Sequence, residues 1–362
     1  MSLEDTLALC YFRHSQMLRD RYVQQLTEVL LRSRQEHTRS KGPAWQFAPV
    51  YHRLHLAWSQ AKAEVEKEGL DSQAEMLDMM LTSSVLRIWG LTKSVYHFHP
   101  SVVQMLLSTP HGDIPHEALY NLPQWCVYVH IPPGMFTYTP IRGGDEVEVS
   151  GFYAMLDAQP KGAEFRKDIG PDGRLEKIGH LLHLVIDRKK AAPYDVAGEL
   201  VRMSIPLAGT IRESVEMMAY GQDAVTADER EGMIDLLSRL VGPVLYLSAR
   251  NREISGEPCN PDRVRFEPPQ KKGRRRSLAR RPPVQVWQVA WRAGAALEPS
   301  TRSEAGEAPT GVTVKPHVRR AHFHSYWCGP GRERCEVRWL GPVFVNSSMA
   351  EDEHRTVTSH QS

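Results

Sequence analysis

The sequence predicts an α+β protein with a helical N-terminal region, a central antiparallel sheet and a small C-terminal β-rich module. Apolar residues recur at helical spacing through the first hundred residues, and short β-branched and aromatic runs follow them. A Pro/Arg-rich stretch at 256–283 then separates this part from a second group of short runs. A chain of 362 residues also fits two domains better than one.

The N-terminal region carries three segments with apolar residues at three- and four-residue steps, as a helix with one buried stripe requires. They run from Leu3 to about Arg34, from Tyr51 to Lys67 and from Asp71 to Trp89, and Gly90 is suited to end the last one. We therefore expect residues 1–100 to be mainly helical.

The next part of the chain mixes strand-like and helix-like patterns. Three runs rich in aromatic and β-branched residues predict antiparallel strands, and they are Trp125–Ile131, Gly151–Leu156 and His180–Ile186. Helical spacing returns from Thr210 to Tyr220 and from Ala227 to about Arg250. We expect strands and helices over 120–250, and residues 1–255 to form one α+β domain.

Residues 256–283 are rich in proline and arginine and cannot bury a core, so we expect an exposed basic linker. Between Arg263 and Arg281, nine Lys and Arg residues stand against one acid, Glu267. Such a run suits RNA, the ribosome or an acidic partner, and a solvated spacer is an equal alternative. The candidate contacts are Lys271, Lys272, Arg274, Arg275 and Arg276.

Residues 284–346 are expected to form the small basic β-rich module, and residues 347–362 a disordered tail. The module has three strand-like runs, which are Val284–Trp291, His317–Trp327 and Cys335–Val345. Small residues from Ala293 to Gly311 predict a loop between the first two, and Cys328–Gly331 predicts a hairpin turn between the last two.

Cysteine usage and the first residues bear on the cellular compartment. Five cysteines form an odd number spread thinly over the chain, which argues against a disulfide framework and favours a reducing compartment. The start, Met1 to Asp5, lacks the basic and apolar regions of a secretory signal, and no apolar run approaches the ~20 residues of a membrane span. We expect a soluble cytoplasmic protein with no membrane contact.

The C-terminal module holds the most informative group of residues. Side chains alternate along a strand, so one face would carry Arg320, His322, His324 and Tyr326, and the other Arg319, Phe323 and Trp327. The hairpin turn would bring Arg338 and Trp339 alongside. Arginine and protonated histidine suit phosphates, and Tyr326, Trp327 and Trp339 would stack on unpaired bases for ~1–3 kcal/mol each.

Two other interpretations compete with RNA contact. His322 and His324, with Arg320, have the residue types of a metal-independent ribonuclease that uses an acid, a base and a cation. In the second interpretation, Trp327 and Trp339 fill the core of a small sheet while the charged residues keep an edge strand soluble. Enzyme classes are disfavoured because the common phosphate-loop, hydrolase and zinc-protease signatures are absent from the sequence.

A metal site is the remaining possibility in this module. His322, His324, Cys328 and Cys335 offer four side chains of the types that zinc prefers. The six-residue gap between the cysteines fits no zinc pattern, so we expect neither a metal nor another cofactor.

Two long motifs resemble the second type V-A anti-CRISPR family. One is Asn121-Leu122-Pro123-Gln124-Trp125-Cys126-Val127-Tyr128-Val129 followed by Gly151-Phe152-Tyr153-Ala154; the other is Pro316-His317-Val318-Arg319-Arg320-Ala321-His322-Phe323-His324-Ser325-Tyr326-Trp327 with Val337-Arg338-Trp339 and Val343-Phe344-Val345-Asn346. The sequence departs from the family pattern in Phe323, where a tryptophan is expected, in Cys328 and Cys335, in a longer N-terminal helical region and in the Arg-rich linker.

The resemblance implies a bacterial inhibitor carried on mobile elements, phage or plasmid. Such proteins are thought to recognise the N-terminal peptide of the type V-A Cas nuclease during translation and to lower the level of its mRNA. For this chain the resemblance therefore implies that a groove in the α+β domain holds the peptide, with strand addition beside Trp125–Ile131 as one way to do so and Trp125 and Tyr128 as candidate contacts. It also implies contact with ribosomal or messenger RNA through the basic linker and C-terminal module. A metal-independent ribonuclease and a plasmid or phage nucleic-acid-binding protein unrelated to CRISPR are the alternatives.

Overall fold

The computed structural model describes residues 82, 85–86, 88–90, 93–140, 144–160, 178–188, 200–221, 225–255, 284–297, 317–332 and 334–345. The predictions for most of the N-terminal helical region, for the basic linker and for the tail therefore fall outside the described residues. Within the described part of the chain, no helix is long and apolar enough to cross a membrane.

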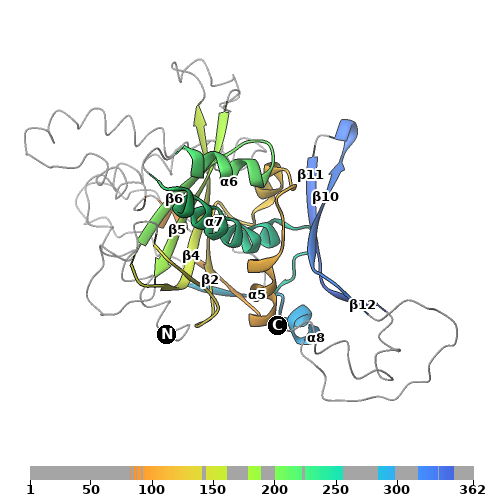
Figure 1. Ribbon diagram of the computed structural model, residues 1–362. Coiled ribbons are helices and arrows are strands. Elements are labelled where there is room, and N and C mark those ends of the chain that lie inside the picture. The colour runs from red at the N-terminus through yellow and green to blue at the C-terminus, as the bar shows by residue number, and fades with distance from the viewer. Residues whose placement is uncertain are drawn as a thin grey trace, which may run out of the picture.

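A central sheet of eight strands organises the fold, and Figure 1 shows helices packed against one of its faces. The strand order is β6-β5-β4-β2-β1-β8-β7, with β3 paired to β4. The strands are β1 Ser94–Phe98, β2 Cys126–His130, β3 Thr137–Tyr138, β4 Val147–Pro160, β5 Ile178–Arg188, β6 Leu200–Leu207, β7 Ile254–Ser255 and β8 Gln285–Val289. The predicted α+β class with a small C-terminal β unit is confirmed.

The central sheet is mixed, although the sequence predicted antiparallel pairing throughout. The pairs β2–β4 and β4–β5 are antiparallel, as expected, and β6 adds antiparallel to β5, but β1 runs parallel to both β2 and β8. Parallel neighbours need a crossover connection. The helix α5, Pro100–Ser108, and the 3-10 helix η3, His116–Asn121, lie between β1 and β2 and provide one.

Two segments differ from the sequence predictions. Residues 94–98 form β1 rather than helix, because every residue of Ser-Val-Tyr-His-Phe is largely enclosed at the centre of the sheet. The predicted strand at 284–291 exists as β8, but it pairs with β1 and not with the C-terminal hairpin. It is followed by the helix α8, Trp291–Leu297, where the sequence predicted a loop from Ala293.

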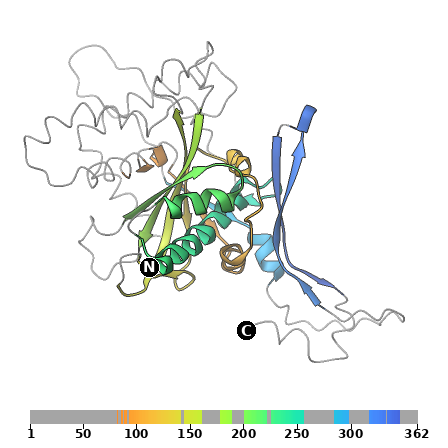
Figure 2. The ribbon, with the colours of Figure 1, turned by 45° about the horizontal axis from the view of Figure 1, so that its top comes forward.

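The helices α5, α6 (Ile211–Tyr220) and α7 (Ala227–Ser248) cover one face of the sheet, as Figures 1 and 2 show. Both predicted helices begin at capping boxes, Thr210 with Glu213 and Thr226 with Glu229, which satisfy amide groups that would otherwise be orphaned. Their apolar side chains join strand residues in one continuous core.

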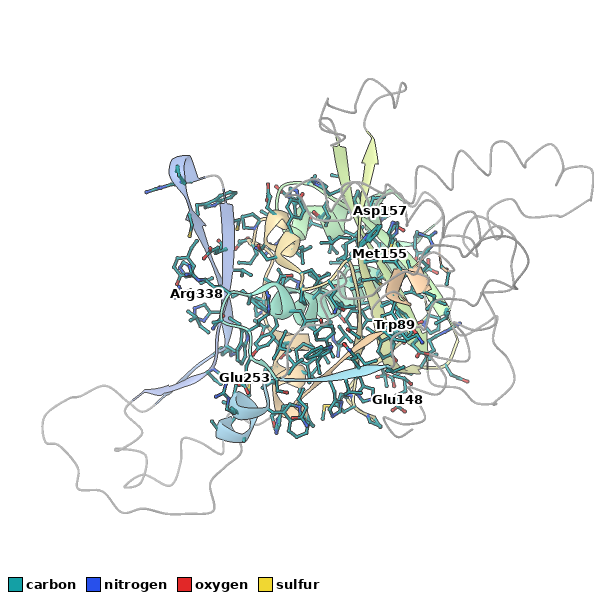
Figure 3. All side chains as sticks on the ribbon, turned by 180° about the vertical axis from the view of Figure 1, so that it is seen from behind. Trp89, Glu148, Met155, Asp157, Glu253 and Arg338 are labelled. Carbon is teal, nitrogen blue, oxygen red and sulfur yellow. The ribbon has the colours of Figure 1, made fainter. Side chains whose placement is uncertain are left out.

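The opposite face of the sheet is buried and unusually polar. Tyr128 on β2 donates a hydrogen bond to Asp187 on β5 at 3.0 Å, and the ring nitrogens of His97 and His130 lie 2.9 Å apart. His183 joins Asp157 at 3.3 Å and Ser204 at 2.7 Å, so a chain of polar groups crosses β4, β5 and β6. Figure 3, seen from behind, shows Met155 and Asp157 on this sheet. Pairing within the network satisfies groups whose burial would otherwise cost free energy.

Helices α5 and α7 cross closely at a glycine. A Cβ atom added at Gly242 would lie 2.2 Å from the backbone oxygen of Leu106, a distance that real contacts do not reach. Gly232, on the same helix, would meet nothing within 4 Å. Of these two glycines of α7, Gly242 is therefore the one that packing requires.

We predict that Gly242→Ala lowers the free energy of unfolding by about 1–3 kcal/mol, because the two helix backbones must separate. Gly232→Ala should raise it by about 0.5–1 kcal/mol through the better helix propensity of alanine. Urea unfolding followed by circular dichroism measures both. A Gly242→Ala protein as stable as the Gly232→Ala protein would contradict the close crossing.

The His97–His130 pair predicts loss of stability in mild acid. Burial and the nearby His97 lower the pKa of His130 from 6.5 to about 4. Burial, and then His99, lower the pKa of His97. Below pH 6.5 His130 becomes protonated in the unfolded chain, whereas in the folded protein it stays neutral down to about pH 4. Stability should fall across this window by up to about 1.4 kcal/mol per pH unit for this residue.

The measurement is urea unfolding at pH 7, 6 and 5 for the parent, His130→Asn and His324→Asn. The His130→Asn protein should show a shallower dependence of stability on pH, because one suppressed titration is gone. His324→Asn changes an exposed histidine outside the buried pair and serves as the control. Identical slopes in all three proteins would show that the buried pair does not act in this way.

Candidate nucleic-acid interface

The C-terminal unit is a two-stranded hairpin that stands beside the helical layer (Figures 1 and 2). Its strands are β10, His322–Cys328, and β11, Arg334–Leu340, joined at the predicted turn through the short 3-10 helix η6, Pro330–Arg332. The predicted strand from 317 to 327 is divided, because β9, His317–Arg319, pairs separately with β12, Val343–Val345. Arg320 and Ala321 lie at the break between β9 and β10.

The inner face of the hairpin packs against the main body. Phe323, Val337 and Trp339 are at most 7% exposed and belong to the main core. The ring of Trp339 meets that of Tyr246 on α7 at 5.5 Å in an edge-on arrangement. This burial is what the core-filling interpretation predicts for Trp339, so its ring is not placed for stacking on a base.

Polar contacts at the end of α7 hold β11 in place. The side-chain amide of Asn251 donates to the Trp339 carbonyl at 2.7 Å and accepts from the Trp339 amide at 3.0 Å. The amide of Arg250 donates to the Val337 carbonyl at 2.9 Å, and its guanidinium pairs with Glu336 at 2.6 Å. Asn251 thus meets both backbone groups of Trp339 as a neighbouring strand would.

The outer face carries the candidate RNA-binding side chains. Cross-strand register places His324 opposite Arg338, and Tyr326 opposite Glu336. The rings of His324 and Tyr326 stack at 4.4 Å with 24° between their planes, and the guanidinium of Arg338 lies 5.3 Å from the Tyr326 ring centre. His324, Tyr326 and Arg338 are all exposed. The structure therefore brings a cation and two aromatic rings together on one accessible surface.

The histidines proposed for catalysis lie on this same face. The Nδ1 atom of His322 lies 3.2 Å from the Arg320 carbonyl oxygen, and that of His324 lies 3.0 Å from the Ser325 carbonyl oxygen. Arg320 is exposed but lies before the strand begins. The side chain of Arg319 falls outside the described residues, as do Lys271, Lys272, Arg274, Arg275 and Arg276.

The four side chains considered for zinc do not converge. Cys335 is 3% exposed on the inner face, and alternation along the two strands places His322, His324 and Cys328 on the other face. Burial raises the pKa of Cys335 to about 11, so its thiol stays protonated at neutral pH. Among the described residues, no group of three or more His, Cys, Asp or Glu side chains is arranged to hold a metal ion.

The two residues predicted to contact a peptide are in the interior. Tyr128 is fully buried, and the indole nitrogen of half-buried Trp125 donates to the Leu156 carbonyl at 2.8 Å. Strand β2 is paired on both sides, with β1 and with β4, so a peptide cannot add beside it. The prediction of strand addition at Trp125–Ile131 is wrong, because the sequence pattern of a central strand resembles that of a buried edge strand.

The structure supplies a different peptide-sized feature, a groove of about 740 Å³ between α5, α6 and α7. Leu107, Ile211, Val215 and Ile234 line its apolar part, and Arg212, Glu216, Asp235 and Arg239 are the charged residues around it. The sequence analysis did not find these residues. Asp235 and Arg239 pair at 3.4 Å with the i,i+4 spacing of a helix, which is the one signal that the sequence offered.

The groove and the hairpin meet at one residue. His111 lines the groove, and its ring packs edge-on against Phe323 of the hairpin with 6.4 Å between ring centres. Burial lowers the pKa of His111, so the imidazole is neutral at this contact at neutral pH. The two candidate surfaces are therefore neighbours in space.

Comparisons with known proteins cover both surfaces. The family model described as "Anti-CRISPR type V subtype A2 family" matches residues 96–347, a range that includes the groove and the hairpin. A crystal structure of AcrVA2 matches with a TM-score of 0.57 and 21% sequence identity, covering 93% of this chain and 98% of that chain. At this identity the likeness shows a shared fold. No curated protein sequence matches the chain.

The different environments of the two hairpin tryptophans give a direct test of its docking. Trp339→Ala should lower the free energy of unfolding by about 3–5 kcal/mol, because it leaves a cavity against Tyr246. Trp327→Ala removes a side chain that is 45% exposed and should lower it by only about 1–2 kcal/mol, because much of the ring is already in water. Urea unfolding of the full-length chain measures both. Equal losses of stability would contradict the described packing of the hairpin.

Proposed function

The chain belongs to the type V subtype A2 anti-CRISPR family, and from this premise we propose that it lowers production of a type V-A Cas nuclease in the bacterial cytoplasm. In this proposal it recognises the N-terminal peptide of the nuclease during translation and reduces the level of its mRNA. The C-terminal module contacts RNA or the ribosome, and the α+β domain contacts the peptide.

The outer face of the hairpin is the observation that carries the RNA part of the proposal. His324, Tyr326 and Arg338 are exposed together on one rigid, docked ribbon. Between residues 317 and 345 the sequence holds five arginines, three histidines and two glutamates. Glu336 pairs with Arg250, which lies outside the module, so Glu336 does not neutralise the module's own arginines. These arginines can therefore bind phosphate groups.

The groove between α5, α6 and α7 supports the peptide part. Its volume, about 740 Å³, fits a short stretch of chain, and its apolar lining offers burial for side chains. Arg212 and Asp235 at its rim are 62% and 65% exposed, so both can pair with charges on a peptide. This groove takes the place of β2 as the proposed peptide site.

The contact between His111 and Phe323 supports action of the two surfaces on one translation complex. A peptide that emerges from a ribosome remains linked to its own message through that ribosome, so two surfaces of one protein can act on the same complex. The groove shares His111 with the packing of the hairpin. The proposal therefore requires both surfaces in the same molecule.

The test is co-expression of the chain with a type V-A nuclease gene, with the nuclease transcript and protein measured. The parent should lower both. A hairpin variant, His324→Ala/Tyr326→Ala/Arg338→Ala, and a groove variant, Arg212→Glu, should restore the transcript, because each removes exposed contacts of about 1–3 kcal/mol. The control Glu231→Ala changes an exposed charge on α7 outside the groove lining and should behave as the parent.

The outcomes separate the parts of the proposal. A transcript unaffected by the parent would refute it as a whole. If only the hairpin variant restores the transcript, the groove has no role in the effect. If only the groove variant restores it, the hairpin has none. Circular dichroism confirms that each variant is folded.

The ribonuclease alternative has its own experiment. His322 and His324 share a face with Arg338, so purified protein is incubated with the nuclease transcript in the absence of metal ions. Cleavage that is lost in His322→Ala or His324→Ala would favour an intrinsic ribonuclease; intact RNA would favour a binding protein that relies on a host nuclease. Membership of the family argues against a nucleic-acid-binding protein unrelated to CRISPR.

A further inference from the structure

The turn end of the hairpin differs from the rest of it in exposing large aromatic side chains on both faces. Tyr326 is 39% exposed and Trp327 is 45% exposed. They are consecutive in β10, so they lie on opposite faces of the ribbon. This end of the hairpin therefore presents an aromatic ring to each side.

The exposure of Trp327 does not follow from the sheet pattern. Trp327 lies on the same side of the ribbon as Phe323, which is 7% exposed. The cross-strand partner of Trp327, Cys335, is 3% exposed, so the body covers the inner face up to this pair, and the turn that follows extends past the helices (Figures 1 and 2). Leaving about half of a tryptophan ring in water is energetically unfavourable because the ring is apolar. Such exposed apolar surface commonly marks a site that a partner covers.

The charges around the turn indicate what this partner is. Arg332, exposed in the turn at φ 55°, and exposed Arg338, beside Tyr326, place a guanidinium on either side of the aromatic pair along the ribbon. Planar guanidinium groups bind phosphate with two hydrogen bonds, and aromatic rings stack on bases. Bases in a duplex are already stacked on one another, so two exposed rings suit an unpaired strand.

We propose that the turn end of the hairpin clamps unpaired RNA, with Tyr326 and Trp327 each stacking one base and Arg332 and Arg338 holding the phosphates between them. This inference rests on the proposed RNA contact and places it at the end of the ribbon, with both faces of the hairpin engaged. The RNA strand passes over the turn, because a flexible single strand can place bases on opposite sides of so narrow an element and a duplex cannot.

The experiment measures fluorescence anisotropy of a labelled, unstructured twelve-nucleotide RNA with the full-length chain. Trp327→Ala and Tyr326→Ala should each weaken binding about 5- to 150-fold, the loss expected for one base–ring stack. Trp327→Phe keeps a ring and should retain most of the affinity. Tyr220→Ala removes another exposed tyrosine, on α6, and should bind as the parent does.

Two further measurements probe the clamp. The same RNA annealed to its complement should bind more weakly than the single strand. In a salt titration, Arg332→Gln should reduce the slope of log affinity against log salt by about 0.7, the value for one phosphate contact on a single strand.

The failure of this inference is distinguishable from the failure of the proposed function. RNA binding by the parent that is unchanged in both Trp327→Ala and Tyr326→Ala would overturn the clamp and leave the RNA contact in place elsewhere on the chain. A duplex bound as tightly as the single strand would also overturn it. If the parent does not bind RNA, both the clamp and the RNA contact of the proposed function are refuted.

Discussion

The docking of β11 onto the end of α7 is the interaction on which both surfaces of the hairpin depend. An isolated two-stranded ribbon is at best marginally stable in water. Here Trp339 buries its ring against Tyr246, and Asn251 meets both backbone groups of the same residue. With the inner face committed to the core, the outer face is left to carry His324, Tyr326 and Arg338 in a fixed arrangement.

The helical layer depends on a comparable constraint at Gly242. The backbone of α5 approaches α7 so closely there that no side chain fits between them. That approach sets the separation of the helices, and the groove lies between their exposed edges. Because His111 lies three residues after α5 and its ring packs against Phe323, the position of α5 also bears on the hairpin. One set of packing contacts thus positions both candidate surfaces.

The sequence predicted those elements whose signals are local. Strands β2, β4 and β5 and helices α6 and α7 carry periodic patterns over their own lengths, and the structure places each within a few residues of the prediction. The shared face of His324 and Tyr326 also followed from alternation, and the short turn predicted that Arg338 lies on the neighbouring strand. The partner of β8, the pairing on both sides of β2 and the groove residues were not predictable, because they arise from contacts between segments far apart in the chain.

The sequence by itself determined the α+β class, the family motifs, the basic character of the C-terminal module and which of its side chains lie on the same side of a strand. The tertiary structure alone decided which side meets the body. Trp327 and Trp339 were equivalent candidates in the sequence, yet Trp339 is 6% exposed and Trp327 is 45% exposed. A strand's period gives the relative direction of its side chains, but burial depends on what packs against the strand, and here that is a helix more than eighty residues earlier in the chain.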